Sequence, residues 1–163
     1  MEPNKATVMV MGFALLACSD VSAEVPAALD ERAPAAAATA PGTLSIRMSG
    51  FRSAAGQVMI TVFRGEDGFP SEPTKAWKSV VAKISGDTAS VDLRDVPPGE
   101  YAFSIFHDEN GNNQLDTSWI GIPKEGLGTS NNAKGRMGPP KYRDAKFTMP
   151  AEGVLQNIKM MYL

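Results

Sequence analysis

The chain has 163 residues and a formal charge of −2, from 16 basic and 18 acidic side chains. This near balance excludes a strongly basic nucleic-acid-binding protein and a polybasic membrane clamp. One Cys and one His exclude an internal disulfide framework and a zinc site built from Cys and His clusters. No apolar run reaches the roughly 20 residues that a membrane-spanning helix requires.

The N-terminal segment has the pattern of an export signal. Residues 6–17 form an apolar run whose length suits a secretory signal peptide. Small residues before Glu24 predict a signal peptide of residues 1–23. A competing site, Leu15-Leu16-Ala17-Cys18, resembles a lipobox and would make Cys18 a lipidated first residue after a signal of residues 1–17. Either site predicts an exported protein, located in the periplasm or held as an outer-membrane or cell-surface lipoprotein.

Residues 24–42 are predicted to be a linker. Eight of these nineteen residues are Ala and three are Pro. Such a segment has little apolar surface to bury, so we expect a disordered or semi-rigid spacer. The remaining 121 residues, 43–163, are enough for one hydrophobic core.

Residues 43–163 have the pattern of an all-β domain. Apolar and polar residues alternate in short segments, as at Leu44, Ile46 and Met48, and Gly or Pro turns separate them. The pattern predicts a single seven-stranded antiparallel β-sandwich, with strands near residues 44–49, 58–63, 79–84, 89–94, 101–107, 146–149 and 154–163. Because the last strand contains no Pro, we expect it in the middle of a sheet.

The clearest candidate for a binding site is the segment from Asp108 to Asp116. Its carboxylate and amide side chains recur at alternate positions, as in short loops that wrap oxygens around Ca²⁺. The candidate metal ligands are Asp108, Asn110, Asn112, Gln114 through its backbone carbonyl, and Asp116. Leu115 is expected to anchor the loop in the core. No Lys or Arg lies between Arg94 and Lys124, so a cation would relieve the repulsion among the five acids there.

The match to an EF-hand loop is incomplete. Its twelfth position is Trp119 rather than Glu, so the bidentate ligand is missing. Because only two of the side-chain ligands are charged, we expect weak Ca²⁺ binding, with a Kd on the order of 10⁻⁴–10⁻³ M. Glu100, Glu109 or Glu125 could complete the shell. The alternative is a solvated turn in which Asp and Asn side chains bond to their own backbone.

His107 directly precedes this loop and lies in register with Tyr101, Phe103 and Ile105, so we expect a half-buried structural residue. An enzymatic alternative, a small periplasmic hydrolase, would use His107, a neighbouring carboxylate and a hydroxyl such as Ser118 or Ser130. No nucleophile motif surrounds either serine.

Residues 117–144 form a long segment without periodicity. Its apolar residues predict that it is ordered and packed; these are Trp119, Ile120, Ile122, Leu127 and Tyr142. If its aromatic side chains were exposed instead, a carrier for a small ligand would be a further alternative. Its basic residues are expected to form salt bridges with the adjacent acidic loop.

The order of the motifs resembles the bacterial DUF2141 family. Four of the segments that carry the resemblance are Gly-Phe-Arg-Ser-Ala-Ala-Gly-Gln-Val (50–58), Leu-Arg-Asp-Val-Pro-Pro-Gly-Glu-Tyr-Ala (93–102), His-Asp-Glu-Asn-Gly-Asn (107–112) and Gly-Ile-Pro-Lys-Glu-Gly-Leu-Gly (121–128). The resemblance covers nearly all of residues 43–163 and implies an exported bacterial protein of unknown function. The Pro-Pro-Gly-Glu-Tyr turn also resembles that of transthyretin-like and collagen-adhesin B-type β-sandwiches, which implies an Ig-like or transthyretin-like fold. Neither resemblance supplies a catalytic residue.

The leading prediction is a non-enzymatic exported β-sandwich protein of the cell envelope, with a weak Ca²⁺-binding loop and a structural or adhesive role. We expect no catalytic residue and no cofactor other than Ca²⁺. The expected partner is an envelope protein or a glycan, and not a nucleic acid. Membrane contact is expected only through the lipid anchor at Cys18.

Overall fold

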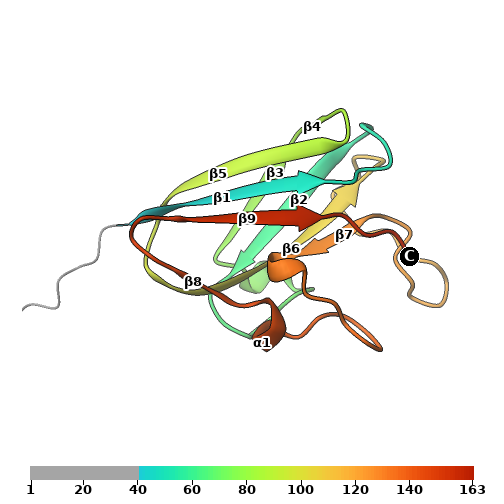
Figure 1. The fold of residues 1–163 in the computed structure, drawn as a ribbon. Helices are drawn as coiled ribbons and strands as arrows, with labels where there is room; N and C mark the ends of the chain where they lie inside the picture. The colour runs from blue at the N-terminus through green and yellow to red at the C-terminus, as the bar shows by residue number, and fades with distance from the viewer. Residues whose placement is uncertain (1–40) are drawn as a thin grey trace, which may run out of the picture. The chain divides into compact units, whose positions relative to one another are not determined.

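The computed structural model describes residues 41–163, and two β-sheets account for most of this part of the chain. The first sheet has the strand order β4-β5-β1-β9, and Figure 1 shows it lying across the second. Its strands are β1 (Gly42–Ser49), β4 (Ile84–Ser85), β5 (Thr88–Val96) and β9 (Val154–Lys159). The predicted signal peptide, Cys18 and nearly all of the predicted linker lie outside the described residues.

The second sheet is built around β6. Its order is β3-β2-β6-β7, and β8 pairs with the first residues of β6 while β7 pairs with later ones. These strands are β2 (Gln57–Phe63), β3 (Lys78–Ala82), β6 (Gly99–Asp108), β7 (Leu127–Thr129) and β8 (Phe147–Met149). Three short helical turns complete the described chain: η1 (Pro73–Lys75), η2 (Ser130–Asn132) and α1 (Tyr142–Ala145). None of the helices in residues 41–163 has the length and apolarity needed to cross a membrane.

One buried cluster contains side chains from both sheets, which explains the alternating pattern of the sequence. Successive strand residues point to opposite faces, so every second residue of β1, β2 and β6 enters the cluster. These residues are Leu44, Ile46, Met48, Val58, Ile60, Val62, Tyr101, Phe103 and Ile105. A shift of one residue in register would expose the whole set, so the pairing is strongly specified.

The structure has nine strands where the sequence pattern predicts seven. The predicted strand 79–84 is divided, because the chain leaves the second sheet after β3 and enters the first sheet at β4. β7 has only three residues and lies within the segment expected to be a loop. Its central Gly128 packs so closely that an added Cβ would lie 2.9 Å from Ile158. A strand this short shows no periodicity.

The final strand is also shorter than predicted and is not in mid-sheet. β9 is an edge strand and pairs with β1 in parallel, whereas every other strand pairing is antiparallel. Amide groups cover its open edge: Asn132 donates to the carbonyl of Asn157 and accepts from the N–H of Lys159, both at 2.8 Å. A side chain therefore supplies the hydrogen bonds that a further strand would otherwise make.

The long segment 117–144 is only partly packed, contrary to expectation. Tyr142 is buried and stacks edge-to-face on Phe69, with 5.7 Å between ring centroids. The expectation is wrong for Trp119, Ile120 and Ile122, which are all exposed, and Leu115 is 38% exposed rather than buried in the core.

Candidate functional site

The candidate loop, residues 108–116, begins where β6 ends. Strand pairing places Asp108 opposite Gln57 of β2. The Asp108 side chain is fully buried, and its Oδ2 accepts hydrogen bonds from the Gln57 amide (2.8 Å) and the backbone N–H of Asn113 (2.9 Å). Its Oδ1 accepts from the backbone N–H of Asn112 (3.0 Å). This carboxylate therefore closes the loop onto the end of the strand.

The hydrogen bonds of Asp108 also determine its charge. Burial raises its pKa, because the charged form loses hydration. Hydrogen bonds from Gln57 and from the backbone N–H groups of Asn113, Asn112 and Gly111 favour the charged form more strongly, and the pKa lies below its ordinary value. Asp108 is therefore ionised at neutral pH.

Three of the other predicted ligands converge on one another. The two carboxylate oxygens of Asp116 accept hydrogen bonds from the side-chain amides of Asn110 (2.6 Å) and Asn112 (3.2 Å). The amide oxygens of these two residues accept backbone N–H groups of Asn112 (3.0 Å) and Gln114 (2.8 Å). The nitrogen and oxygen of a carboxamide occupy nearly equivalent positions. Turning both amides over would aim their oxygens at Asp116, at the expense of those backbone bonds.

The three acids proposed to complete the shell have different positions. Glu125 is buried, and its two oxygens accept the backbone N–H groups of Glu109 (2.9 Å) and Asp116 (3.0 Å), so it joins the two ends of the loop. Glu109 forms two hydrogen bonds with Arg52, at 2.7 and 2.9 Å. Glu100 is at the other end of β6, where it pairs with Lys146 at 2.8 Å, and it takes no part in the loop.

Within residues 41–163, no basic residue of segment 117–144 forms a salt bridge with this loop, contrary to expectation. In the described chain, Glu109 forms a salt bridge with Arg52, which precedes β2, and Lys146 forms one with Glu100. Arg143 lies 3.6 Å from its neighbour Asp144. Apart from Glu109, which pairs with Arg52, the carboxylates of the loop accept hydrogen bonds from uncharged amides and backbone N–H groups.

His107 is completely buried rather than half-buried. Its Nε2 lies 2.8 Å from the carbonyl oxygen of Ala55, which can only accept, so Nε2 carries the hydrogen. Its Nδ1 lies 2.9 Å from the hydroxyl of Tyr162. Burial raises the pKa of Tyr162, which keeps that hydroxyl protonated and able to donate to Nδ1. Phe51 packs edge-to-face on the imidazole at 5.2 Å.

This arrangement gives no support to the hydrolase alternative. A general base needs a free nitrogen within reach of substrate, and both nitrogens of His107 are engaged in the protein interior. The hydroxyl of Ser130 donates to the carbonyl of Ala145 (2.7 Å), and the hydroxyl of Ser118 accepts from the N–H of Ile122 (3.0 Å). Both serines therefore have roles in holding the backbone.

Several residues of the site were not singled out by the sequence pattern. Gln57 reaches the loop from the first position of β2, and Arg52 reaches it from the segment before β2. Tyr162 reaches His107 from the C-terminal segment. Gly56 has φ of +70°, and a Cβ there would collide with the carbonyl of Asp108. A signal existed, because the segment Gly-Phe-Arg-Ser-Ala-Ala-Gly-Gln-Val (50–58) belongs to the family resemblance.

The donor set has limited charge. Within residues 41–163, no group of three or more His, Cys, Asp or Glu side chains is placed to hold a metal ion. The predicted ligands within the loop comprise two carboxylates, Asp108 and Asp116, two carboxamides, Asn110 and Asn112, and the backbone carbonyl of Gln114. Such oxygen donors suit a hard cation such as Ca²⁺, held weakly.

A shallow cavity of about 610 Å³ lies on the first sheet, away from this loop. It includes three basic residues, Arg47, Lys83 and Lys159, together with Ser, Thr and Asn side chains, and no residue of 107–126 lines it. Arg47 is already paired with Asp92 at 2.7 Å.

Comparison with known proteins identifies one family. Residues 46–157 match the family described as "Uncharacterized protein conserved in bacteria (DUF2141)". No curated protein and no solved structure matches the chain.

Proposed function

The chain belongs to the DUF2141 family, and we propose that it is a non-enzymatic exported protein of the cell envelope, with a structural or adhesive role. Its 108–116 loop binds Ca²⁺ weakly. The observation that carries this proposal is the convergence of the Asn110, Asn112 and Asp116 side chains. The backbone N–H of Asn112, which donates to both Asn110 and Asp108, joins them to the ionised carboxylate of Asp108.

The bonds already present in the loop indicate what the ion does. In the absence of a cation, the Asn110 and Asn112 amides donate hydrogen bonds to Asp116 but leave its negative charge uncompensated. A cation replaces the amide hydrogens, and the amides turn so that their oxygens face it. Asp108 and Glu125 hold the loop ends through backbone N–H groups in both cases, so binding needs no refolding. The ion stiffens a loop that the fold has already positioned.

The structural role rests on the fold. The domain is a β-sandwich of the transthyretin-like kind, an interpretation supported by one core shared between two sheets and by antiparallel pairing everywhere except between β1 and β9. The export role rests on the apolar run of residues 6–17 and the two processing sites that follow it. Mass spectrometry of the mature N-terminus distinguishes the two processing sites, because one leaves a lipidated Cys18 and the other a free Glu24.

Thermal unfolding with Ca²⁺ and with a chelator tests the proposed function. For a Kd of about 1 mM, about 10 mM Ca²⁺ adds roughly 1.4 kcal/mol to the free energy of unfolding, by RT ln(1 + [L]/Kd). This raises Tm by several degrees.

Two variants make the test specific. Asp116→Ala removes a ligand and abolishes the rise in Tm, whereas Asp92→Ala, an exposed acid on the first sheet, retains it. An equal Tm in Ca²⁺ and in chelator, or a rise that survives in Asp116→Ala, contradicts the proposal.

A further inference from the structure

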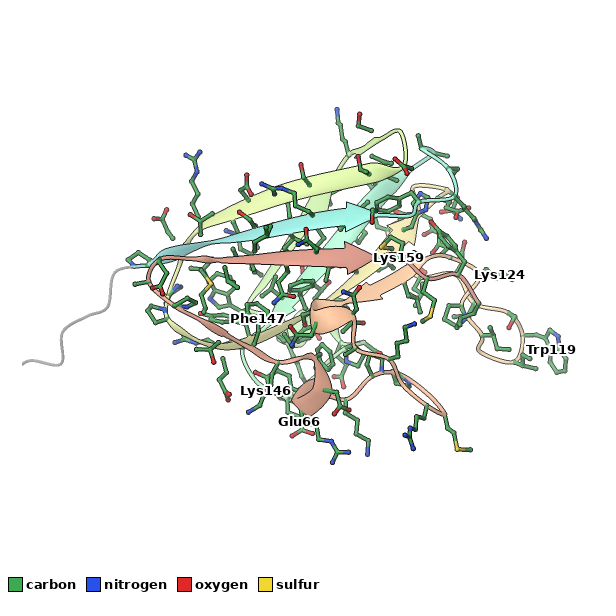
Figure 2. All side chains as sticks on the ribbon, in the orientation of Figure 1. Glu66, Trp119, Lys124, Lys146, Phe147 and Lys159 are labelled. Carbon is green, nitrogen blue, oxygen red and sulfur yellow. The ribbon has the colours of Figure 1, made fainter. Side chains whose placement is uncertain are left out.

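The hairpin that follows the candidate loop displays apolar side chains to solvent. Trp119 is 96% exposed, Ile120 58% and Ile122 46%; we call these three residues the apolar tip. Figure 2 shows Trp119 projecting from the end of the molecule. None of the three belongs to a buried cluster of the described chain. Adjacent exposed apolar side chains on a folded protein indicate a contact surface.

The backbone of the hairpin enforces this exposure. The N–H of Ser118 donates to the carbonyl of Ile122 (2.7 Å), and the N–H of Gly121 donates to the carbonyl of Ser118 (2.9 Å). Thr117 and Pro123 form a β-bridge below this turn. The apolar tip therefore cannot fold back onto the core without breaking these contacts.

The base of the hairpin is held to the rest of the domain. Glu125 accepts the N–H of Asp116 (3.0 Å), and the Arg52 guanidinium donates to the carbonyl of Lys124 (3.1 Å). A surface presented on a fixed base loses little conformational entropy when it is occupied.

The charge of the segment that carries the apolar tip indicates the chemistry of the occupant. Residues 117–144 contain five basic residues and two acids: Glu125, which is buried with both oxygens bonded to backbone N–H groups, and Asp144, which lies 3.6 Å from Arg143. Four of the basic residues are exposed and form no ion pair within residues 41–163: Lys124, Lys134, Arg136 and Lys141. The complementary surface is therefore anionic.

A lipid surface fits this combination better than a glycan. Trp is favoured at the boundary between headgroups and acyl chains, and nearby Lys and Arg are attracted to anionic headgroups. The neighbours of Trp119 in the apolar tip are aliphatic, whereas a sugar would need hydrogen-bonding side chains beside the ring. Within the described residues, the β1 strand begins at the end of the domain opposite to Trp119 (Figures 1 and 2).

We infer that the apolar tip inserts into an anionic lipid surface, while Lys124 and the basic residues of the following loop contact the headgroups. This membrane contact is separate from the predicted lipid anchor at Cys18 and does not depend on Ca²⁺ binding. Its failure and the failure of the proposed Ca²⁺ site are therefore distinguishable.

Tryptophan fluorescence tests this inference on the full chain, because the chain has two Trp residues. Trp77→Phe leaves Trp119 as the reporter, so contacts made by the N-terminal segment do not contribute to its signal. With vesicles of phosphatidylcholine and phosphatidylglycerol, we expect its emission to move to shorter wavelength and to be quenched by brominated acyl chains. The matched control is Trp119→Phe, in which Trp77 packs against the core and its emission stays unchanged.

A pair of charge variants tests the electrostatic part. Lys134→Glu with Arg136→Glu should weaken vesicle binding of the Trp119 reporter severalfold. The same exchange at Lys78 and Lys83, on and beside β3, should leave it unchanged. Higher ionic strength should weaken binding as well.

Three results overturn the inference. In the first, Trp119 emission remains that of an exposed indole at all vesicle concentrations. In the second, pure phosphatidylcholine vesicles shift it equally, so the anionic surface has no role. In the third, the shift occurs without vesicles and grows with protein concentration, in which case a second copy of the chain occupies the apolar tip.

Discussion

Two neighbouring segments between β6 and β7 have opposite relations to solvent. In the candidate loop, residues 108–116, polar side chains bond to one another, to backbone N–H groups and to Gln57 and Glu125. In the hairpin immediately after it, the side chains of Trp119, Ile120 and Ile122 are exposed and belong to no buried cluster of the described chain. The polar segment is thus internally satisfied, and the apolar one exposes surface that the fold does not cover. The comparison shows that the polarity of a residue alone does not predict which part of a connection is exposed to solvent.

Among the acids of the candidate site, the largest effect on the free energy of unfolding is expected at Asp108. Asp108→Ala leaves the backbone N–H groups of Asn112 and Asn113 without their acceptor at the end of β6. We expect the free energy of unfolding to fall by about 2–4 kcal/mol, measured by urea denaturation. Asp116→Ala, whose partners are exposed amides, should cost less than about 1 kcal/mol. Equal losses of unfolding free energy in the two variants would contradict the view that the buried Asp108 holds the loop to β6 while Asp116 bonds only to solvent-exposed amides.

The next largest effect is expected at Glu125, which joins the ends of the loop. Glu125→Ala removes the acceptor of two backbone N–H groups and should cost about 1–3 kcal/mol in urea denaturation. Glu109→Ala breaks a partly exposed ion pair with Arg52 and should cost about 0–1 kcal/mol. A larger loss at Glu109 would mean that the salt bridge, rather than the buried carboxylate, holds the loop.

Acid pH tests the charge of Asp108. Its pKa in the folded state lies below its unfolded value of about 3.9. Its ionisation therefore contributes stability that is fully present above about pH 4 and is lost as the pH falls through the folded pKa. The stability difference between the wild type and Asp108→Asn should be constant from about pH 5 to 7 and should narrow below about pH 4. A difference that grows on acidification contradicts the assigned sign.

The smallest effect on stability is expected at the apolar tip. Trp119→Ala should change the free energy of unfolding by no more than about 0.5 kcal/mol, because the indole is almost fully exposed. Tyr142→Ala, in the same long segment but packed on Phe69, should cost about 3–5 kcal/mol, by analogy with other large-to-small core substitutions. A large loss at Trp119 would show that it packs against the protein in solution.

The strands were predictable where one face is buried, because the period of two at Leu44, Ile46 and Met48 reports the core directly. The division of segment 79–84 between two sheets was not predictable, because nothing in the residue type of Lys83 indicates that the chain passes from one sheet to the other there. Nor was the edge position of β9 predictable. The absence of Pro permits a central strand, but the Asn132 amide covers the edge through contacts between residues far apart in sequence.

The candidate site shows a similar limit. Spacing located the loop and the position of Asp116, because alternate oxygen side chains are a local feature of the chain. The burial of His107 against Ala55 and Tyr162, and the role of Glu125, depend on tertiary contacts that no local pattern encodes. Apolar character predicted a packed Trp119, but the turn from Ser118 to Ile122 directs it to solvent.

Residue-resolved titration with Ca²⁺ by ¹H–¹⁵N NMR tests the proposed metal site most directly. We expect the backbone amides of residues 108–116, with Asn112 and Gln114 among the most affected, to shift together and saturate at millimolar Ca²⁺. These amides donate to the side chains that would turn toward the ion. The resonances of β1 and β9, in the first sheet, should not move. Amides of the loop that remain unchanged up to about 10 mM Ca²⁺, ten times the Kd of about 1 mM expected for a weak site, would contradict the account.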